Sequence, residues 1–290
     1  MARAQEAPVP GSVDAAPPAR GGALWKRVLS TVILLPVFVG IVMVGPVWLF
    51  GVLVVLISAV AQWEFTGMFE RAGVRTFRWL GLVGGTAVTA SFALPISERV
   101  AFTAVLLAVL LSALWRPRGA RIAWEPAAVT LFGICYVNWL LGYGFWLRDL
   151  PAGSDWVLLL VGVTWLGETA AYVVGSTLGR TKLAPVISPR KTVEGAAAQL
   201  VVSVLAAVVA QVWFFAGIGL RHAVIAGLLL GVVGQFGDLV ESALKRSVGT
   251  KDTGALIPGH GGLLDRLDSL LFNTPALFYY TRFIAGLTPP

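Results

Sequence analysis

Long runs of apolar residues, separated by short polar segments, make up most of this 290-residue chain. A helix that spans the hydrocarbon core of a bilayer needs about 20 mostly apolar residues. On that criterion the pattern predicts nine transmembrane helices, and the predicted fold class is an all-α integral membrane protein. The expected spans cover roughly residues 28–45, 47–63, 79–96, 100–115, 127–147, 156–177, 196–217, 222–240 and 269–285.

The composition supports this interpretation. Hydrophobic residues make up 57% of the chain and charged residues only 13%, whereas charged residues account for about 25% of soluble domains. The formal net charge of +7 therefore indicates membrane topology, because Lys and Arg collect in the cytoplasmic loops of membrane proteins. We expect no nucleic-acid partner. The single cysteine, Cys135, lies in an apolar run and has no partner for an intramolecular disulfide.

The basic residues also predict an orientation. Residues 1–23 are rich in Ala, Pro and Gly, which is typical of a disordered tail, and residues 24–290 are expected to form one transmembrane domain. With the tail in the cytoplasm, nine spans place nearly all of the 22 Lys and Arg residues on the cytoplasmic side. The polar segments 178–195 and 241–268 then share that face, and we expect a polar cavity to open there. The exceptions to the charge pattern are Arg99, Arg148, Arg221 and Arg282.

The end of the eighth span, "GDLVESALKR", places four polar residues on one helical face. Asp238, Glu241, Ser242 and Lys245 stand at i, i+3, i+4 and i+7. Asp238 lies about 24 Å from the start of the span, near the inner edge of the hydrocarbon. A carboxylate at that depth is expected to face a cavity and hold a cation. The alternative is an i, i+4 ion pair of Glu241 with Lys245, and a hydrated Asp238 at a helix end.

A glycine-rich stretch, "GHGGLLDRLDS", follows before the last span. Gly261 and Gly262 would let the backbone approach a ligand closely, and the first amides of the last helix could receive a phosphate. Asp265 and Asp268 share a face at that helix start, and oxygen ligands of this kind suit Mg²⁺. The alternative is a plain turn in which His260 caps the backbone.

The other long polar segment contains "ISPRKTVEG". Ser188 followed by Pro189 predicts the start of a helix, because Ser is a favoured N-cap and Pro a favoured first residue. Arg190 and Lys191 would then lie in the first turn, where the helix dipole disfavours cations unless an anion binds there. The alternative is that these two residues only follow the charge rule for cytoplasmic loops.

Glu168 lies inside the sixth span, in the sequence "GETAAYVVG". Counted from residue 156 it is about 18 Å along the helix, within the inner half of the bilayer. An ionisable residue at that depth is expected to be functional and to face the cytoplasmic cavity. The alternative is a structural hydrogen bond to a neighbouring helix.

These residues resemble a known signature. "KRSVGTKDTGALIPGHGGLLDRLDS" and the preceding Ser242 resemble the signature of phosphatidate cytidylyltransferases, also called CDP-diacylglycerol synthases, and "KLAPVISPRKTVEG" is similar to a second stretch of that family. The resemblance covers about residues 164–285, the expected catalytic region. One departure is Glu168, which stands where the family has Asp before "TAAY".

The resemblance implies an enzyme that joins phosphatidate to CTP and releases pyrophosphate and CDP-diacylglycerol. It also implies one or two Mg²⁺ ions, a homodimer and a place in the plasma (inner) membrane with the active site facing the cytoplasm. By the resemblance, Asp238 and Asp265 match the metal-binding aspartates of the family, and Asp268 and Asp252 are the next candidates. The expected catalytic residues are Lys245, Arg246, Lys251, His260 and Arg266. The expected substrate-binding residues are Ser188, Arg190, Lys191, Thr192, Glu194, Ser242, Gly261, Gly262 and Glu168.

Two other functions stay open on the sequence alone. Another CTP-using lipid enzyme, such as a polyprenol kinase or an archaeal-type lipid cytidylyltransferase, needs the same charges. A secondary transporter of an anionic solute would use Glu168 and Asp238 as coupling sites. Transporters of that kind are typically built from related halves with a site near the midplane, whereas these charges gather on one face and no internal repeat is visible.

Overall fold

A computed structural model describes residues 32, 35–114, 124–254 and 261–284 of the chain. Helices dominate this part, and each of the nine predicted spans overlaps a helical segment of the described residues. The first is Leu35–Val44. The next are α2 (Val47–Arg71), α3 (Arg78–Ser91), α4 (Glu98–Leu114), α5 (Glu125–Gly133), η1 (Ile134–Trp139) and α6 (Leu140–Asp149). The remaining long elements are α7 (Gly153–Thr177), α8 (Val193–Trp213), α9 (Leu220–Ser247), α10 (Asp268–Tyr279) and η4 (Tyr280–Ile284).

Five helical segments in the described ranges are long and apolar enough to cross a bilayer. They are α2, the continuous stretch Glu125–Asp149, α7, α8 and α9. Over the described residues, the helix Leu35–Val44, α3, α4 and α10 are shorter. The chain is thus a multi-pass membrane protein, and the prediction of nine full spans goes beyond these five.

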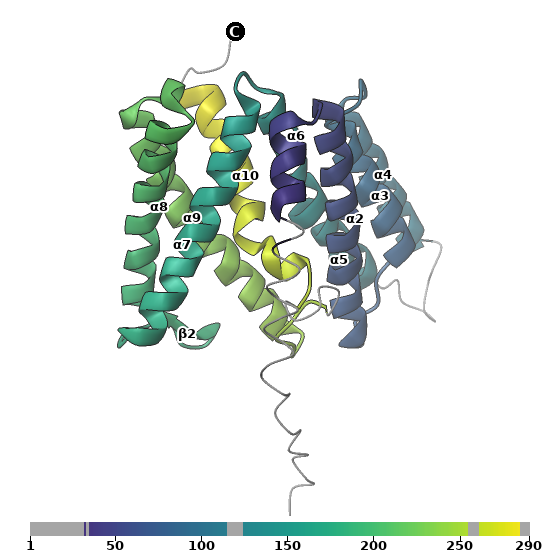
Figure 1. Ribbon diagram of the computed structural model, residues 1–290. Coiled ribbons are helices and arrows are strands. Elements are labelled where there is room, and N and C mark those ends of the chain that lie inside the picture. The colour runs from purple at the N-terminus through teal and green to yellow at the C-terminus, as the bar shows by residue number, and fades with distance from the viewer. Residues whose placement is uncertain (1–31, 33–34, 115–123, 255–260, 285–290) are drawn as a thin grey trace, which may run out of the picture.

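The helices form one bundle with two neighbouring parts (Figure 1). In one part α7, α8 and α9 pack in sequence, and α10 packs against α9, α7 and α6. In the other part α3, α4, α5 and η1 surround a smaller apolar cluster that includes Val88, Phe92 and Val109. The larger apolar core extends from α2 through α6 and α7 to α10. Helices α2, α6 and α10 therefore lie where the two parts meet.

A short β-hairpin corrects one prediction about the segment after α7. Ser188 and Pro189 do not begin a helix; Ser188–Thr192 forms strand β2, which pairs antiparallel with β1 (Lys182–Ala184). Helix α8 begins at Val193 instead, with Thr192 as its N-cap, and the Thr192 side chain accepts a hydrogen bond from Gly195 N at 3.1 Å. A β-branched threonine in extended backbone favours both the strand and the cap. Arg190 and Lys191 are therefore strand residues.

Three smaller features complete the described chain. The helical turn η2 (Ala216–Ile218) precedes α9, and η3 (Leu264–Arg266) precedes α10. Helix α9 is longer than predicted, because it continues from residue 240 to Ser247. The additional turns carry Glu241, Ser242 and Lys245, so the residues expected to do chemistry are held on a regular helix.

Candidate functional site

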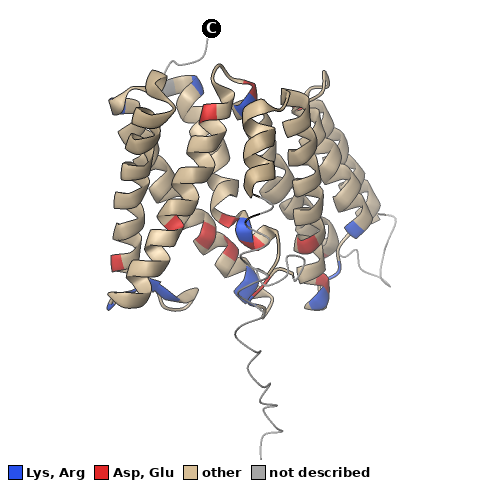
Figure 2. Cartoon of the chain, in the orientation of Figure 1, with Lys and Arg blue, Asp and Glu red and all other residues tan. Residues whose placement is uncertain are grey.

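Most of the charged residues lie toward one end of the bundle, the end that carries the hairpin (Figure 2). Lys245, on the last turns of α9, contacts two of the acidic residues. Its Nζ donates to Glu241 Oε1 at 2.9 Å and to Asp265 Oδ1 at 2.8 Å. The i, i+4 pair of Glu241 with Lys245 is thereby confirmed, and the same ammonium group also binds a carboxylate 20 residues further along the chain.

Asp265 receives hydrogen bonds on both of its oxygens. Besides the bond from Lys245, Oδ2 accepts from Thr253 N at 3.1 Å, from Thr253 Oγ1 at 3.0 Å and from Gly262 N at 3.0 Å. Burial alone would raise the pKa of Asp265, but the Lys245 ammonium and the backbone amides favour the charged form and hold the pKa below its usual range. The segment between α9 and η3, residues 248–263, is the signature loop. Asp265 therefore ties the signature loop to α9.

Asp238 is bound from the hairpin. Lys191 Nζ lies 2.6 Å from Asp238 Oδ2, and Ser242 Oγ donates to Asp238 Oδ1 at 3.3 Å. The side chains of Lys191 and Asp238 are only 23% and 30% exposed, so this contact is partly shielded from water. The structure thus brings together Lys191, Asp238 and Ser242, three residues that the sequence placed in two separate segments.

Two more carboxylates lie near Asp238. Glu168 on α7 is close to the Ser269 hydroxyl and within electrostatic range of Asp238, Lys191 and Arg266. Asp268, at the start of α10, interacts electrostatically with Asp238, Glu168 and Glu241. Close packing brings these helices together, because a Cβ added to Gly237 on α9 would lie only 2.6 Å from Asp268 O. Acidic side chains from α7, α9 and α10 therefore lie within electrostatic range of one another.

The carboxylates differ in how well they fit a metal ion. Glu168, Asp238 and Asp268 offer hard oxygen donors near one another, which is the chemistry that Mg²⁺ prefers. Asp265 fits less well in this arrangement, because both of its oxygens already accept hydrogen bonds. Within the described ranges no three Asp, Glu, His or Cys side chains stand together as a ready metal-binding group. The acids would have to move closer to surround a cation.

Other predicted site residues lie at the periphery or hold the local structure. Arg190, Arg246, Lys251, Asp252 and Arg266 are exposed. Arg246 donates to Thr250 O at 3.0 Å. The Glu194 carboxylate accepts from Thr181 N at 3.1 Å, which closes the hairpin onto α8, and Ser188 and Thr192 belong to the same hairpin. The predicted role of His260 lies outside the described residues.

The two described glycines of the signature serve the loop itself. Gly261 has φ +85°, a conformation that glycine adopts readily and other residues rarely do. Gly262 is buried, and a Cβ added there would lie 2.7 Å from Glu64 Oε2 and 2.9 Å from Gly254 N. The sequence predicted that a ligand would approach the backbone closely at Gly262. In the structure, the Glu64 carboxylate and the Gly254 backbone make that close approach.

Sequence reasoning missed two residues from α2. Glu64 is 6% exposed, and its Oε2 accepts from Leu264 N at 2.8 Å. Arg71 donates from Nη2 to Thr253 O at 2.5 Å. Both contacts join positions about 180 to 200 residues apart. The sequence offered one signal, a glutamate at the end of an apolar segment. A carboxylate in such a position is energetically unfavourable unless it has a partner.

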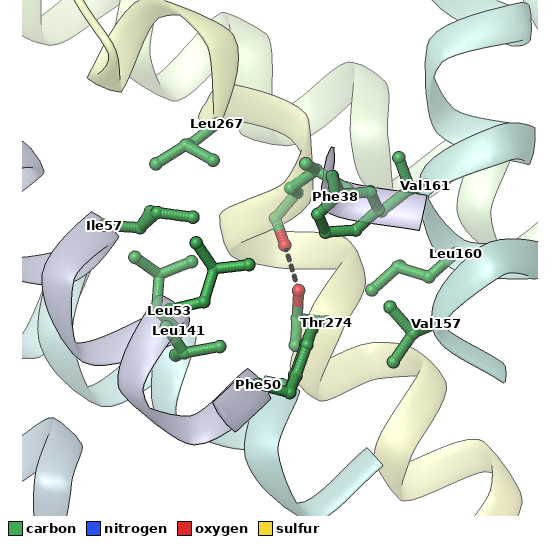
Figure 3. Close-up of a pocket in the computed structure, with 13 residues that line it drawn as sticks. Phe38, Phe50, Leu53, Ile57, Leu141, Val157, Leu160, Val161, Leu267 and Thr274 are labelled. Carbon is green, nitrogen blue, oxygen red and sulfur yellow. Dashed lines mark hydrogen bonds between the residues drawn. The ribbon is translucent and has the colours of Figure 1, made fainter. Parts of the chain in front are cut away.

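An apolar pocket of about 80 Å³ lies between the helix Leu35–Val44, α2, α6, α7 and α10 (Figure 3). Its lining includes Phe38, Ile57, Val161 and Thr274, and the Thr274 hydroxyl donates to Leu270 O at 2.6 Å. Leu267 and Leu270 also line it, and they flank Asp268 in the sequence. The pocket and the acidic region therefore share the chain segment around Asp268.

Comparison with known proteins places the chain in a family. The sequence model of the cytidylyltransferase family matches residues 25–284. The phosphatidate cytidylyltransferase of Staphylococcus saprophyticus is 41% identical over 157 residues, which cover 54% of this chain and 60% of that enzyme. The phosphatidate cytidylyltransferase of Bacillus subtilis is 35% identical over 268 residues, which cover 88% of this chain and 96% of that enzyme. The first match thus spans less than two thirds of the relative, and the second spans nearly all of it. The chain belongs to the cytidylyltransferase family.

Proposed function

We propose that this chain is a phosphatidate cytidylyltransferase, which transfers CMP from CTP to phosphatidate and releases pyrophosphate. A phosphate oxygen of phosphatidate would attack the α-phosphorus of CTP, and the bond from that phosphorus to the oxygen of the leaving pyrophosphate would break. The observation that supports this best is the pair of lysine-carboxylate contacts, Lys191 with Asp238 and Lys245 with Asp265, at one end of a membrane bundle. Family membership and the two named relatives support the same reaction.

The chemical problem is to bring two polyanions together. No protein nucleophile is needed, since the phosphate of phosphatidate is already anionic at neutral pH. Catalysis then depends on alignment and charge neutralisation. Lys191 and Lys245 are held in place by carboxylates, so each ammonium group is fixed before a phosphate arrives. Arg190, Arg246, Lys251 and Arg266 are exposed within the chain's two polar segments, where they would attract the triphosphate and the lipid headgroup.

A divalent cation belongs to the proposal. We expect Mg²⁺ to be held by Asp238 together with Asp268 or Glu168, and by Asp265 if its bond from Lys245 is released. When bound, the ion would neutralise charge on the triphosphate and on the departing pyrophosphate. The side chains themselves act by positioning. Asp238 and Asp265 keep Lys191 and Lys245 at defined positions, and Ser242 orients the Asp238 carboxylate.

The membrane arrangement completes the proposal. The proposed protein has nine spans, a cytoplasmic N-terminus and a polar cavity on the charged side. This arrangement would expose the site to CTP in the cytoplasm and place the protein in the inner membrane. Phosphatidate would enter from the side, between helices. The apolar pocket beside Leu267 and Leu270 would receive part of one acyl chain while the rest stays in the bilayer. A homodimer is proposed on the resemblance alone.

The reaction can be tested with purified protein, phosphatidate vesicles, Mg²⁺ and CTP labelled on either the α- or the γ-phosphate. Cytidylyl transfer predicts that the α-label appears in the lipid product and that the γ-label leaves as pyrophosphate. A polyprenol kinase would transfer the γ-label to its own lipid and leave CDP, so label from γ-CTP in lipid would refute the proposal. Absence of label in lipid, combined with counterflow of an anion in proteoliposomes, would establish the transporter instead.

A further inference from the structure

Helix α2 comes from the half of the chain outside the signature, yet its Glu64 carboxylate lies directly against the signature loop. Glu64 is 6% exposed, and its Oε2 accepts from the backbone N–H of Leu264 at 2.8 Å. The other oxygen, Oε1, is buried and has no hydrogen-bond partner within the described ranges. Leaving a buried carboxylate oxygen without a partner is unfavourable, so stability alone does not explain a glutamate here.

Two glycines leave room for this carboxylate. A Cβ added to Gly262 would lie 2.7 Å from Glu64 Oε2, and one added to Gly254 would lie 3.0 Å from Glu64 Cδ. Both distances are shorter than carbon contacts allow. The loop backbone on either side of residues 255–260 is therefore packed onto Glu64 with no side chain between them.

The same stretch of backbone holds Asp265 from its other side. Gly262 N and Thr253 N, which neighbours Gly254, donate to Asp265 Oδ2 at 3.0 and 3.1 Å. Asp265 in turn accepts from Lys245. Arg71, two turns beyond Glu64 on α2, holds Thr253 through its carbonyl oxygen at 2.5 Å. A continuous set of contacts therefore leads from α2, through the loop, to the Asp265–Lys245 pair.

We propose that Glu64, assisted by Arg71, is a positioning residue for the reaction: it fixes the Thr253–Gly254 and Gly262–Leu264 backbone so that Asp265 and Lys245 are aligned for catalysis. The inference rests on the proposed function. The described hydrogen bond of Glu64 is with loop backbone, so it acts through Asp265. A rigid helix behind a glycine-rich loop supplies the kind of support that precise active-site geometry requires.

The decisive experiment compares Glu64→Gln with Glu70→Gln on the same helix. Glu70 binds Arg78 and Thr76, and its described hydrogen bonds do not reach residues 253–267, so it controls for loss of an α2 carboxylate. Two quantities are measured for each full-length variant in detergent: kcat and KM for CTP, and backbone hydrogen exchange across the whole chain. For Glu64→Gln we expect a kcat at least tenfold lower, a KM for CTP within threefold of wild type, and faster exchange confined to residues 253–267. Glu70→Gln should keep kcat and loop exchange within twofold.

Two results would overturn the proposal. One is wild-type kcat in Glu64→Gln; the other is faster exchange throughout the helices, which would make Glu64 a general stability residue. If Glu64→Gln does not fold, Arg71→Gln decides, since it breaks the other anchor of Thr253 and must lower kcat and loosen the same loop. Failure of the proposed function can be told apart from failure of this inference. If the proposed function is wrong, the wild type lacks cytidylyl transfer, but hydrogen exchange in Glu64→Gln and wild type still shows whether Glu64 holds the loop.

Discussion

Replacing Lys245 by Met tests whether this lysine is the charge partner that keeps α9 and the signature loop together. The side chains of Lys245, Glu241 and Asp265 are 13%, 1% and 8% exposed. Met has a similar length and no charge, so the substitution leaves two nearly buried carboxylates facing each other. Removing one partner of a buried ion pair costs about 3–5 kcal/mol. At about 2–4 °C per kcal/mol, Tm should fall by about 6–20 °C.

The assay is thermal unfolding in detergent followed by tryptophan fluorescence, for which the chain has 11 Trp residues. Lys245→Met combined with Glu241→Gln should recover more than half of the lost stability, because one unpaired charge is removed, but it should not restore activity. Lys251→Met is the matched control, since that lysine is exposed and surface substitutions usually change stability by less than about 0.5 kcal/mol. A Tm for Lys245→Met within about 2 °C of wild type would refute the reasoning.

Three further predictions concern the same cluster. Asp265→Asn should abolish CTP-dependent lipid product while expression and oligomer size, measured by size-exclusion chromatography, stay unchanged; wild-type turnover would remove Asp265 from the site. Lys191→Ala should raise KM for CTP or phosphatidate, and unchanged kinetics would mean that Lys191 serves only membrane topology. Because the pKa of Asp265 is lowered in the folded protein, its contribution to stability is complete above the ordinary carboxyl pKa of about 3.9 and is lost as the pH falls through the lower folded pKa. Tm measured against pH should show this loss in wild type and a flatter acid limb in Asp265→Asn.

The helical architecture could be predicted because apolar length is a local property of the sequence. Every predicted span overlaps a helical segment of the described residues, and the ion pair of Glu241 with Lys245, given as the alternative for that helical face, is present. The hairpin was missed for an equally local reason. Ser188 and Pro189 satisfy the rules for a helix start, but Thr192 satisfies them as well and is the residue that caps α8.

The support of the site from α2 could not be predicted by the same means. Glu64 directly follows the expected span 47–63, which meets the criteria for an ordinary span, and its partner Leu264 is 200 residues away. Periodicity and capping rules describe neighbours within a few turns, so they do not report contacts of this kind. The pairing of Lys191 with Asp238 has the same origin, because the sequence placed both residues on one face of the membrane but could not join them.

The start of α10 at Asp268 has a consequence for how the proposed substrates would meet. Leu270 and Thr274, which line the apolar pocket, follow Asp268 on the same helix, and six residues rise about 9 Å along a helix at 1.5 Å per residue. A nucleotide held beside Asp268 would then be within reach of a headgroup whose acyl chain occupies the pocket. The lipid would not have to be lifted out of its leaflet.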